Sequence, residues 1–127
     1  MVLIDSLVWI DYFRNGTNAI GDMVDSLIDK NEIAISGVIE LELYQGAFPK
    51  EREIISELFQ EILYIPTKRE HYIEAGESIL KLRRKGLFLP PSDVLIAMIC
   101  IFEDLSLLTL DKHFSHFPNL RLIPHYP

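Results

Sequence analysis

Short runs of apolar and β-branched residues alternate along the chain with longer amphipathic segments. This alternation is typical of a parallel sheet with helices on both faces. We therefore predict an α/β sandwich whose central, mostly parallel sheet has four to five strands. The predicted strands are residues 2–4, 33–35, 63–65, 107–109 and 120–123. The predicted helices are residues 7–13, 19–30, 38–46, 51–62, 68–85 and 91–102, with Gly16, Gly46 and Gly86 at expected helix ends.

Two of these predicted helices differ in their expected surroundings. The helix at residues 91–102 is apolar nearly all round, which predicts a central, buried position. The helix at residues 68–85 has a charged reverse face, which predicts a peripheral position. Its apolar stripe is formed by Tyr72, Gly76, Ile79 and Leu80.

The composition is that of one folded domain, which we expect to span residues 1–127. Hydrophobic residues make up 49% of the chain and charged residues 24%, which excludes disorder as the main state. Cys100 is the only cysteine, so no internal disulfide forms and we expect a cytoplasmic location. The longest apolar run, residues 94–102, is far shorter than the ~18 to 20 residues of a membrane span, so we expect no membrane partner.

Three acids stand where parallel strands end or where the buried helix begins. Asp5 follows the first predicted strand, Asp111 follows the fourth, and Asp93 opens the helix at 91–102. Ligands of open α/β sheets bind beyond the carboxyl ends of the strands, so these acids are candidates for a site. Each Asp alone also has a structural explanation, because Asp is a favoured N-cap and the helix dipole stabilises an acid in the first turn. Ser92 competes with Asp93 for that cap.

Glu42 has no explanation as a cap. It projects from the middle of an apolar arc of the helix at 38–46, and a buried carboxylate costs several kcal/mol unless a partner faces it. That partner is a cation, a proton or a strong hydrogen-bond donor, and a buried Arg and a metal ion are the two cations to weigh. Four carboxylates without cysteine are hard ligands that suit Mg²⁺ or Mn²⁺, and such ions serve phosphodiester hydrolysis. The arc is formed by Leu41, Val38, Gly46, Ile39 and Leu43.

Four segments resemble the PIN domain family, in particular its VapC-type ribonuclease toxins of toxin–antitoxin pairs. Residues 2–11 resemble the opening strand with its acid, Ser and Trp, and residues 35–46 resemble the helix with a Glu-Leu-x-x-Gly motif. Residues 86–97 are similar to the family's Asp before an apolar helix, and residues 108–114 to its Thr-x-Asp motif. The order and spacing of these segments cover nearly the whole chain.

The resemblance implies a PIN-like three-layer sandwich with metal-dependent endoribonuclease activity, a homodimer, and neutralisation by a small antitoxin. The cofactor implied is Mg²⁺, with Mn²⁺ as the alternative ion. Many relatives carry a further acid where this chain has His113, which leaves one side of the site open. The implied catalytic residues are Asp5, Glu42, Asp93 and Asp111, with Asp5 and Asp93 as metal ligands.

Two further sets of residues complete the prediction. Ser6 and Thr109 adjoin candidate ligands and are expected to orient a carboxylate or a metal-bound water, although Ser6 is also a good capping residue. Three basic residues at the end of the helix at 68–85 either are solvated cations that complement the helix dipole or contact RNA phosphates. Position does not decide between these roles. The three residues are Arg83, Arg84 and Lys85.

Two other classes of protein are weighed against a nuclease. A phosphoacceptor receiver domain has a similar length, but it needs an Asp at the end of the middle strand, where this chain has Tyr64 to Thr67. A PIN-fold binding module without catalysis is the stronger alternative, and only His113 favours it.

Overall fold

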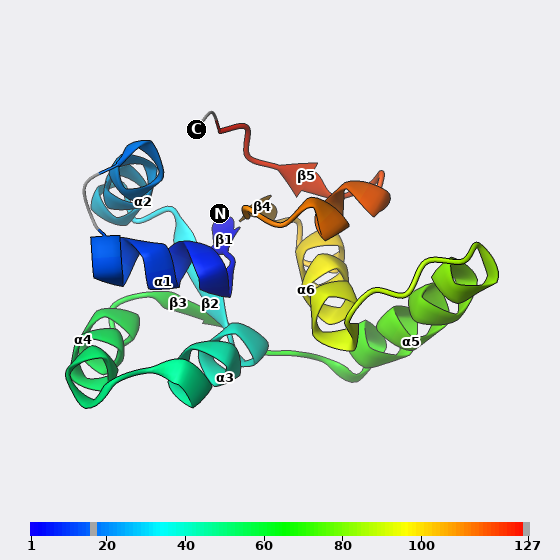
Figure 1. Cartoon of the computed structure of the whole chain (residues 1–127), viewed down its shortest axis with the longest axis horizontal. Helices are drawn as coiled ribbons and strands as arrows, with labels where there is room; N and C mark the ends of the chain where they lie inside the picture. The colour runs from blue at the N-terminus through cyan, green and yellow to red at the C-terminus, as the bar shows by residue number, and fades with distance from the viewer. Residues whose placement is uncertain (16–17, 126–127) are drawn as a thin grey trace.

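The computed structural model describes residues 1–15 and 18–125, so the helix end predicted at Gly16 lies outside the described residues. Five strands form one sheet in the order β3-β2-β1-β4-β5, and all four neighbouring pairs are parallel. Helices α1 and α2 lie on one side of the central strands and α6 on the other, with α5 packed outside α6 (Figure 1). The predicted α/β architecture with a parallel sheet is confirmed.

The helices and strands begin and end close to the predicted residues. The strand β4 ends one residue earlier than predicted, so Thr109 starts a loop. The strands are β1 Val2–Ile4, β2 Ile33–Ser36, β3 Leu63–Ile65, β4 Ser106–Leu108 and β5 Arg121–Leu122. The helices are α1 Ser6–Asn15, α2 Ala19–Asp29, α3 Gly37–Gly46, α4 Pro49–Phe59, α5 Arg69–Arg84, α6 Pro91–Phe102 and the 3-10 helix η1 Lys112–His116.

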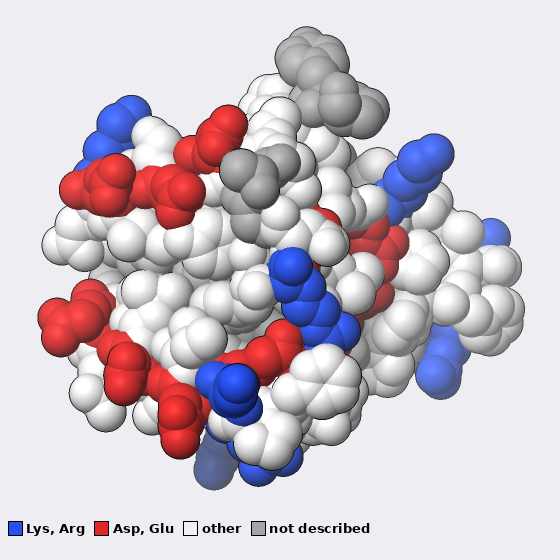
Figure 2. Space-filling model, turned by 60° about the vertical axis from the view of Figure 1, so that its left-hand side comes forward, with Lys and Arg blue, Asp and Glu red and all other residues white. Residues whose placement is uncertain are grey.

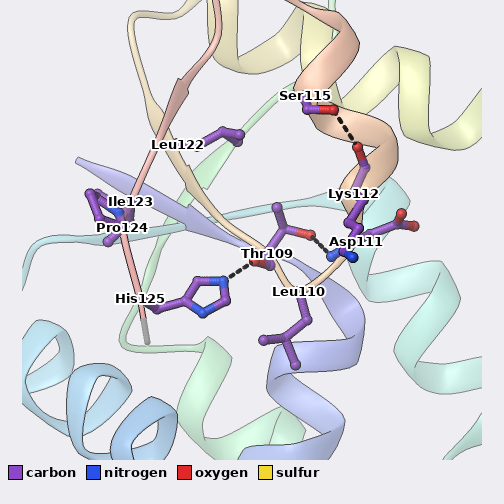
Figure 3. A pocket seen from close by; sticks show the side chains of 9 residues that line it. All are labelled: Thr109, Leu110, Asp111, Lys112, Ser115, Leu122, Ile123, Pro124 and His125. Carbon is purple, nitrogen blue, oxygen red and sulfur yellow. Dashed lines mark hydrogen bonds between the residues drawn. The ribbon is translucent and has the colours of Figure 1, made fainter. Parts of the chain in front are cut away.

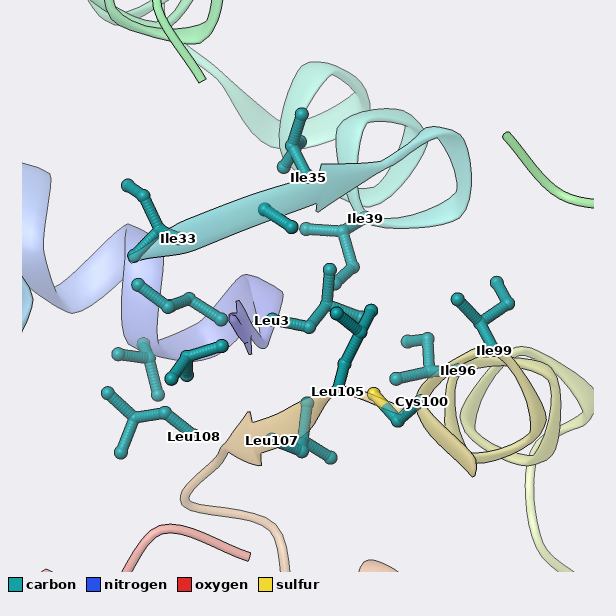
Figure 4. Close-up of a cluster of buried hydrophobic side chains, with 14 of the residues drawn as sticks. Leu3, Ile33, Ile35, Ile39, Ile96, Ile99, Cys100, Leu105, Leu107 and Leu108 are labelled. Atoms are coloured by element: carbon teal, nitrogen blue, oxygen red, sulfur yellow. The ribbon is translucent and has the colours of Figure 1, made fainter. Parts of the chain in front are cut away.

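The hydrophobic core fills both faces of the central strands, against α6 on one face and against α1 and α2 on the other. Every residue of β1 and β2 is buried, and α6 contributes an uninterrupted buried run from Ile96 to Cys100 (Figure 4). Fully burying one aliphatic side chain of this size contributes about 1.5–3 kcal/mol, so this layer anchors the ends of β1 and β4. The predicted central position of the helix at 91–102 is confirmed. Among the described residues, no helix has both the length and the apolar character needed to cross a membrane.

The buried face of α5 differs from the predicted stripe. Tyr72 is 58% exposed and Leu80 51% exposed, whereas His71 and Ala75 are buried. The predicted stripe is therefore wrong at Tyr72 and Leu80, whereas Ile79 packs against the core as predicted, and the polar His71 occupies the first buried position. The peripheral placement of α5 is correct, since it packs against α6 outside the sheet.

Candidate active site

Four acids from four separate segments line one cavity at the carboxyl end of the sheet. Asp5 directly follows β1, Asp111 lies in the loop after β4, and these two strands are neighbours. The chain leaves β1 for β2 on one side and returns to β4 on the other, so the strand order reverses at this point, where α/β sheets bind ligands. Glu42 on α3 and Asp93 in the first turn of α6 complete the set around a cavity of about 250 Å³.

Asp5 is held rigidly beneath this cavity. Its side-chain Oδ1 accepts the N–H of Ser6 at 2.8 Å, and its Oδ2 accepts the hydroxyl of Thr109 at 2.7 Å. The Thr109 Oγ1 also accepts the N–H of Asp111 at 3.0 Å, so one hydroxyl ties two of the acids together. An N-cap side chain accepts from the second or third helical residue, whereas Asp5 accepts from the first, Ser6. Capping of α1 therefore does not explain Asp5.

Burial sets the acidity of Asp5. Residue Asp5 is only 4% exposed, and this burial raises the pKa of its carboxyl above the usual value. The hydrogen bonds from Thr109 and Ser6 lower the pKa, while the negative charges of Asp93 and Asp111 raise it further. The carboxylate is thus destabilised as an anion, and a cation at the site would relieve that cost.

Glu42 is half-buried at the edge of the same cavity. Burial, followed by the charges of Asp5 and Asp93, raises the pKa of Glu42 to about 6, and a hydrogen bond with the Ser6 side chain opposes the rise. Within residues 1–15 and 18–125, its buried Oε1 finds no hydrogen-bond partner. The predicted arc was partly wrong, because Leu41 is 66% exposed and the buried residues of α3 are Ile39 and Leu43. Glu42 therefore lies beside the buried face instead of in its middle.

Asp93, Asp111 and His113 form the outer side of the site. The His113 Nδ1 lies 3.3 Å from Asp93 Oδ2 and 3.3 Å from Asp111 Oδ1. Asp111 caps η1 by accepting the N–H of His113 at 2.9 Å. The predicted capping role is confirmed for this residue, which also lines the cavity. Asp93 is not the cap of α6, and neither is Ser92, because Pro90 occupies that position. Burial raises the pKa of Asp93, which the contact with His113 lowers.

The donor set fits a divalent cation. Oxygen ligands from four carboxylates are the chemistry that Mg²⁺ and Mn²⁺ select. The unpartnered Oε1 of Glu42 and the raised pKa values of Asp5, Glu42 and Asp93 all indicate negative charge that this part of the chain leaves uncompensated. Oxygen and nitrogen atoms of Asp93, Asp111 and His113 also lie within 4.8 Å of one another, close enough to hold one ion.

The predicted basic residues are not part of this cavity. Arg83, Arg84 and Lys85 are exposed at the C-terminal end of α5, which projects away from the sheet (Figure 1). Across the described ranges they form no ion pair or hydrogen bond with the four acids. Acidic side chains are spread over the face in Figure 2, with fewer basic ones between them, in keeping with the net charge of −7. Attraction of a polyanion to this protein therefore depends on local groups of cations.

The sequence predicts no role for two histidines, His71 and His125, because their partners are distant along the chain. A ring nitrogen of His125 lies 2.8 Å from the carbonyl oxygen of Thr109 and so donates to it, which supports the loop that carries Thr109 and Asp111. Figure 3 shows this contact at the rim of a second cavity of about 520 Å³, next to Asp111. No local pattern in the sequence indicates such a contact.

The other histidine, His71, belongs to a structural cluster with Lys68, Glu70 and Glu103. Its Nδ1 accepts the N–H of Lys68 at 2.8 Å, so the ring proton is on Nε2, which lies 3.1 Å from Glu103 Oε1. The ammonium of Lys68 lies 2.9 Å from the same oxygen. The Nε2–H group of His71 and the ammonium of Lys68 both face this carboxylate, so the cluster ties the start of α5 to the end of α6.

Comparison with known proteins identifies the family of this chain. Residues 2–120 match the family model of the PIN domain, and the chain belongs to the PIN domain family. Ribonuclease VapC19 of Mycobacterium tuberculosis (strain CDC 1551 / Oshkosh) is 26% identical over 122 residues, which cover 95% of this chain and 98% of that protein. The resemblance predicted from the four sequence segments is confirmed.

Solved structures share the fold over nearly the full length. A chain of VapBC2 from Rickettsia felis, bound to a DNA fragment from its promoter, superposes with a TM-score of 0.82 at 24% identity and covers 97% of this chain and 98% of its own. A chain of DNA-bound VapBC from Salmonella typhimurium gives a TM-score of 0.82 at 20% identity, with 96% of each chain covered.

Proposed function

We propose that this protein is a metal-dependent endoribonuclease that hydrolyses RNA phosphodiester bonds and acts as the toxin of a toxin–antitoxin pair. The observation that carries the proposal is the convergence of Asp5, Glu42, Asp93 and Asp111 on one cavity, with a buried Glu42 oxygen left unpartnered by the described residues. Membership in the PIN domain family and the similarity to Ribonuclease VapC19 support the same activity. A catalytically inactive PIN-fold binding module is the alternative.

In this proposal each of the four acids has its own role in catalysis. Asp5 and Asp93 hold Mg²⁺ or Mn²⁺, which when bound activates water and neutralises charge at the phosphate. Thr109 and the N–H of Ser6 fix both oxygens of Asp5, so this ligand does not rotate. Glu42 lines the cavity, and its carboxylate, whose buried Oε1 has no partner among the described residues, orients the attacking water there. Asp111, fixed by its own hydrogen bonds, completes the negative wall of the site.

Removal of divalent ions tests the activity directly. We expect purified protein, free of any co-purifying partner, to cleave RNA in Mg²⁺ or Mn²⁺ and to stop in EDTA, with activity restored when the metal is added back. The measurement is the appearance of fragments from structured and single-stranded RNA. A folded sample that cleaves no RNA in either metal supports the inactive binding module, whereas cleavage that persists in EDTA rules out the proposed metal centre.

The exposed cations at the end of α5 are proposed to contact RNA phosphates. We expect the double variant Arg83→Ala/Arg84→Ala to raise KM for RNA several-fold with kcat unchanged. The variant should also make KM depend less steeply on salt, because each phosphate contact contributes about −0.7 to the slope of the logarithm of the binding constant against the logarithm of the salt concentration for single strands. The matched control is Lys30→Ala/Lys50→Ala, which changes the net charge equally at exposed positions elsewhere. Equal effects of the two double variants would show that only net charge matters.

A second copy of the chain is proposed to cover an exposed apolar hollow. Leu41, Tyr64 and Tyr72 are each at least half exposed and line a cavity of about 510 Å³ that runs from α3 to the start of α5. Apolar surface gathered in this way marks a protein interface. The antitoxin, in contrast, is proposed to insert basic side chains into the acidic cavity, to which they are electrostatically complementary. The VapBC complexes of similar fold support a partner of this kind.

The dimer proposal predicts the effect of one surface charge. We expect Tyr72→Glu to convert a dimer into a 14.7 kDa monomer, because a carboxylate buried at an apolar interface is costly. Light scattering coupled to gel filtration measures the mass. Phe88→Glu is the control, since Phe88 is 75% exposed but does not line the hollow. A wild-type monomer, or a Phe88→Glu variant that dissociates equally, would place the interface elsewhere.

A further inference from the structure

The position of the His113 ring relative to two carboxylates carries one more inference. Its Nδ1 lies at the same distance, 3.3 Å, from an oxygen of Asp93 and from an oxygen of Asp111. The ring is 47% exposed, so no packing of the core forces it toward the acids. The contact with Asp93 is a hydrogen bond when Nδ1 carries the ring proton, and when the proton is on the other nitrogen Nδ1 presents a lone pair beside two carboxylate oxygens, as a metal ligand does.

The spacing of these three atoms suits a metal ion. Two ligands at adjacent corners of an octahedral Mg²⁺ or Mn²⁺ site lie about 3 Å apart when each bond is about 2.1 Å. The two distances from His113 Nδ1 are close to that value, and the three side chains form one group whose ligand atoms lie within 4.8 Å of one another. Two hydrogen bonds hold this corner in place: the backbone N–H of His113 donates to Asp111 Oδ1, and the backbone N–H of Asp111 donates to Thr109 Oγ1.

We propose that His113 Nδ1 and Asp111 join Asp5 and Asp93 as metal ligands, and that this nitrogen makes the site select Mn²⁺ over Mg²⁺. The inference rests on the proposed metal-dependent nuclease and deepens it. Imidazole nitrogen binds transition ions well and Mg²⁺ poorly, whereas carboxylate oxygen suits both. A purely carboxylate site has no such preference, so the histidine at this position determines which ion is held.

The alternative role of His113 is structural. In that case a protonated ring donates to the two acids, balances their charge and never contacts the metal. The two roles differ in one observable, the presence of a nitrogen atom in the coordination sphere of the bound ion. They also differ in the effect of a carboxylate at position 113. If His113 is a metal ligand, the carboxylate replaces one ligand with another; if His113 is a structural cation, the carboxylate removes the positive charge between the two acids.

The test uses Mn²⁺ as the probe on the full-length protein. We expect pulsed electron paramagnetic resonance of the Mn²⁺-loaded wild type to show coupling to a directly bound ¹⁴N nucleus, and we expect His113→Asp to abolish it. Competition of Mg²⁺ against Mn²⁺ should show the affinity ratio in favour of Mn²⁺ falling about tenfold or more in His113→Asp. The control is His116→Asp, which makes the same substitution at an exposed residue of the same 3-10 helix and should retain both properties.

The outcomes separate this inference from the nuclease proposal. Mn²⁺ binding without nitrogen coupling in the wild type, or an unchanged ion preference in His113→Asp, overturns the ligand role of His113 and leaves the metal-dependent nuclease intact. Failure of the folded wild type to bind Mn²⁺ or Mg²⁺ at all overturns both. Loss of the nitrogen coupling in His116→Asp would show that His116, and not His113, is the ligand, and would overturn this inference.

Discussion

Asp5→Asn should abolish RNA cleavage while leaving the metal-free protein at least as stable as the wild type. The substitution keeps the shape of the side chain but removes the charge that binds the metal. Loss of a group that only supports a ligand costs about 10–100-fold in metal affinity or activity, so removal of the ligand itself should cost more than a hundredfold. Cleavage rate in saturating Mg²⁺ or Mn²⁺ is the measurement.

The expected stability of this variant follows from the pKa of Asp5. Burial and the charges of Asp93 and Asp111 raise that pKa in the folded protein, so the ionised carboxyl destabilises the fold at neutral pH. Asn carries no charge and removes this penalty, which offsets the loss of one of the two acceptor oxygens of Asp5, and the removal of charge stabilises Glu42→Gln in the same way. Urea unfolding without metal measures the effect. A metal-free Asp5→Asn protein that is several kcal/mol less stable would show that Asp5 serves the fold and not the metal.

The sequence predicted the site to the extent that the site follows from strand order. Parallel strands end at the same edge, so the acids after β1 and β4 had to lie near one another once the sheet was recognised. Burial of α6 could also be predicted from the sequence, because a helix that is apolar all round is buried in the core of a sandwich. Glu42 was singled out correctly as a carboxylate near a buried face, although the face itself was assigned partly wrongly at Leu41.

What the sequence did not predict depends on contacts between distant residues. The hydroxyl of Thr109 reaches Asp5 across 104 positions of the chain, and the rotamer that makes this bond has no local signature. The same holds for His71, whose burial depends on Lys68 and Glu103 and which reads in the sequence as an ordinary surface residue. Polar residues on a buried helix face mislead periodicity arguments, because their partners and not their hydropathy place them there.

Thr109→Val should impair both stability and metal binding, because one hydroxyl serves two of the acids. Val keeps the volume of Thr but leaves Asp5 Oδ2 without its donor and the N–H of Asp111 without its acceptor. An unsatisfied buried polar group costs about 1–3 kcal/mol, so urea unfolding should show a loss of that size. Activity should fall about 10–100-fold, as for other groups that orient a metal ligand.

The direction of the change in metal affinity follows from the same hydrogen bond. The Thr109 hydroxyl lowers the pKa of Asp5, so its loss raises that pKa and makes the carboxyl bind protons more readily and metal less. Thr109→Ser keeps the hydroxyl and should retain most of the Mn²⁺ affinity, which separates the hydrogen bond from packing of the methyl group. If Thr109→Val binds Mn²⁺ as tightly as Thr109→Ser, the ion does not depend on the orientation of Asp5, and Asp93 with its neighbours must supply the binding energy.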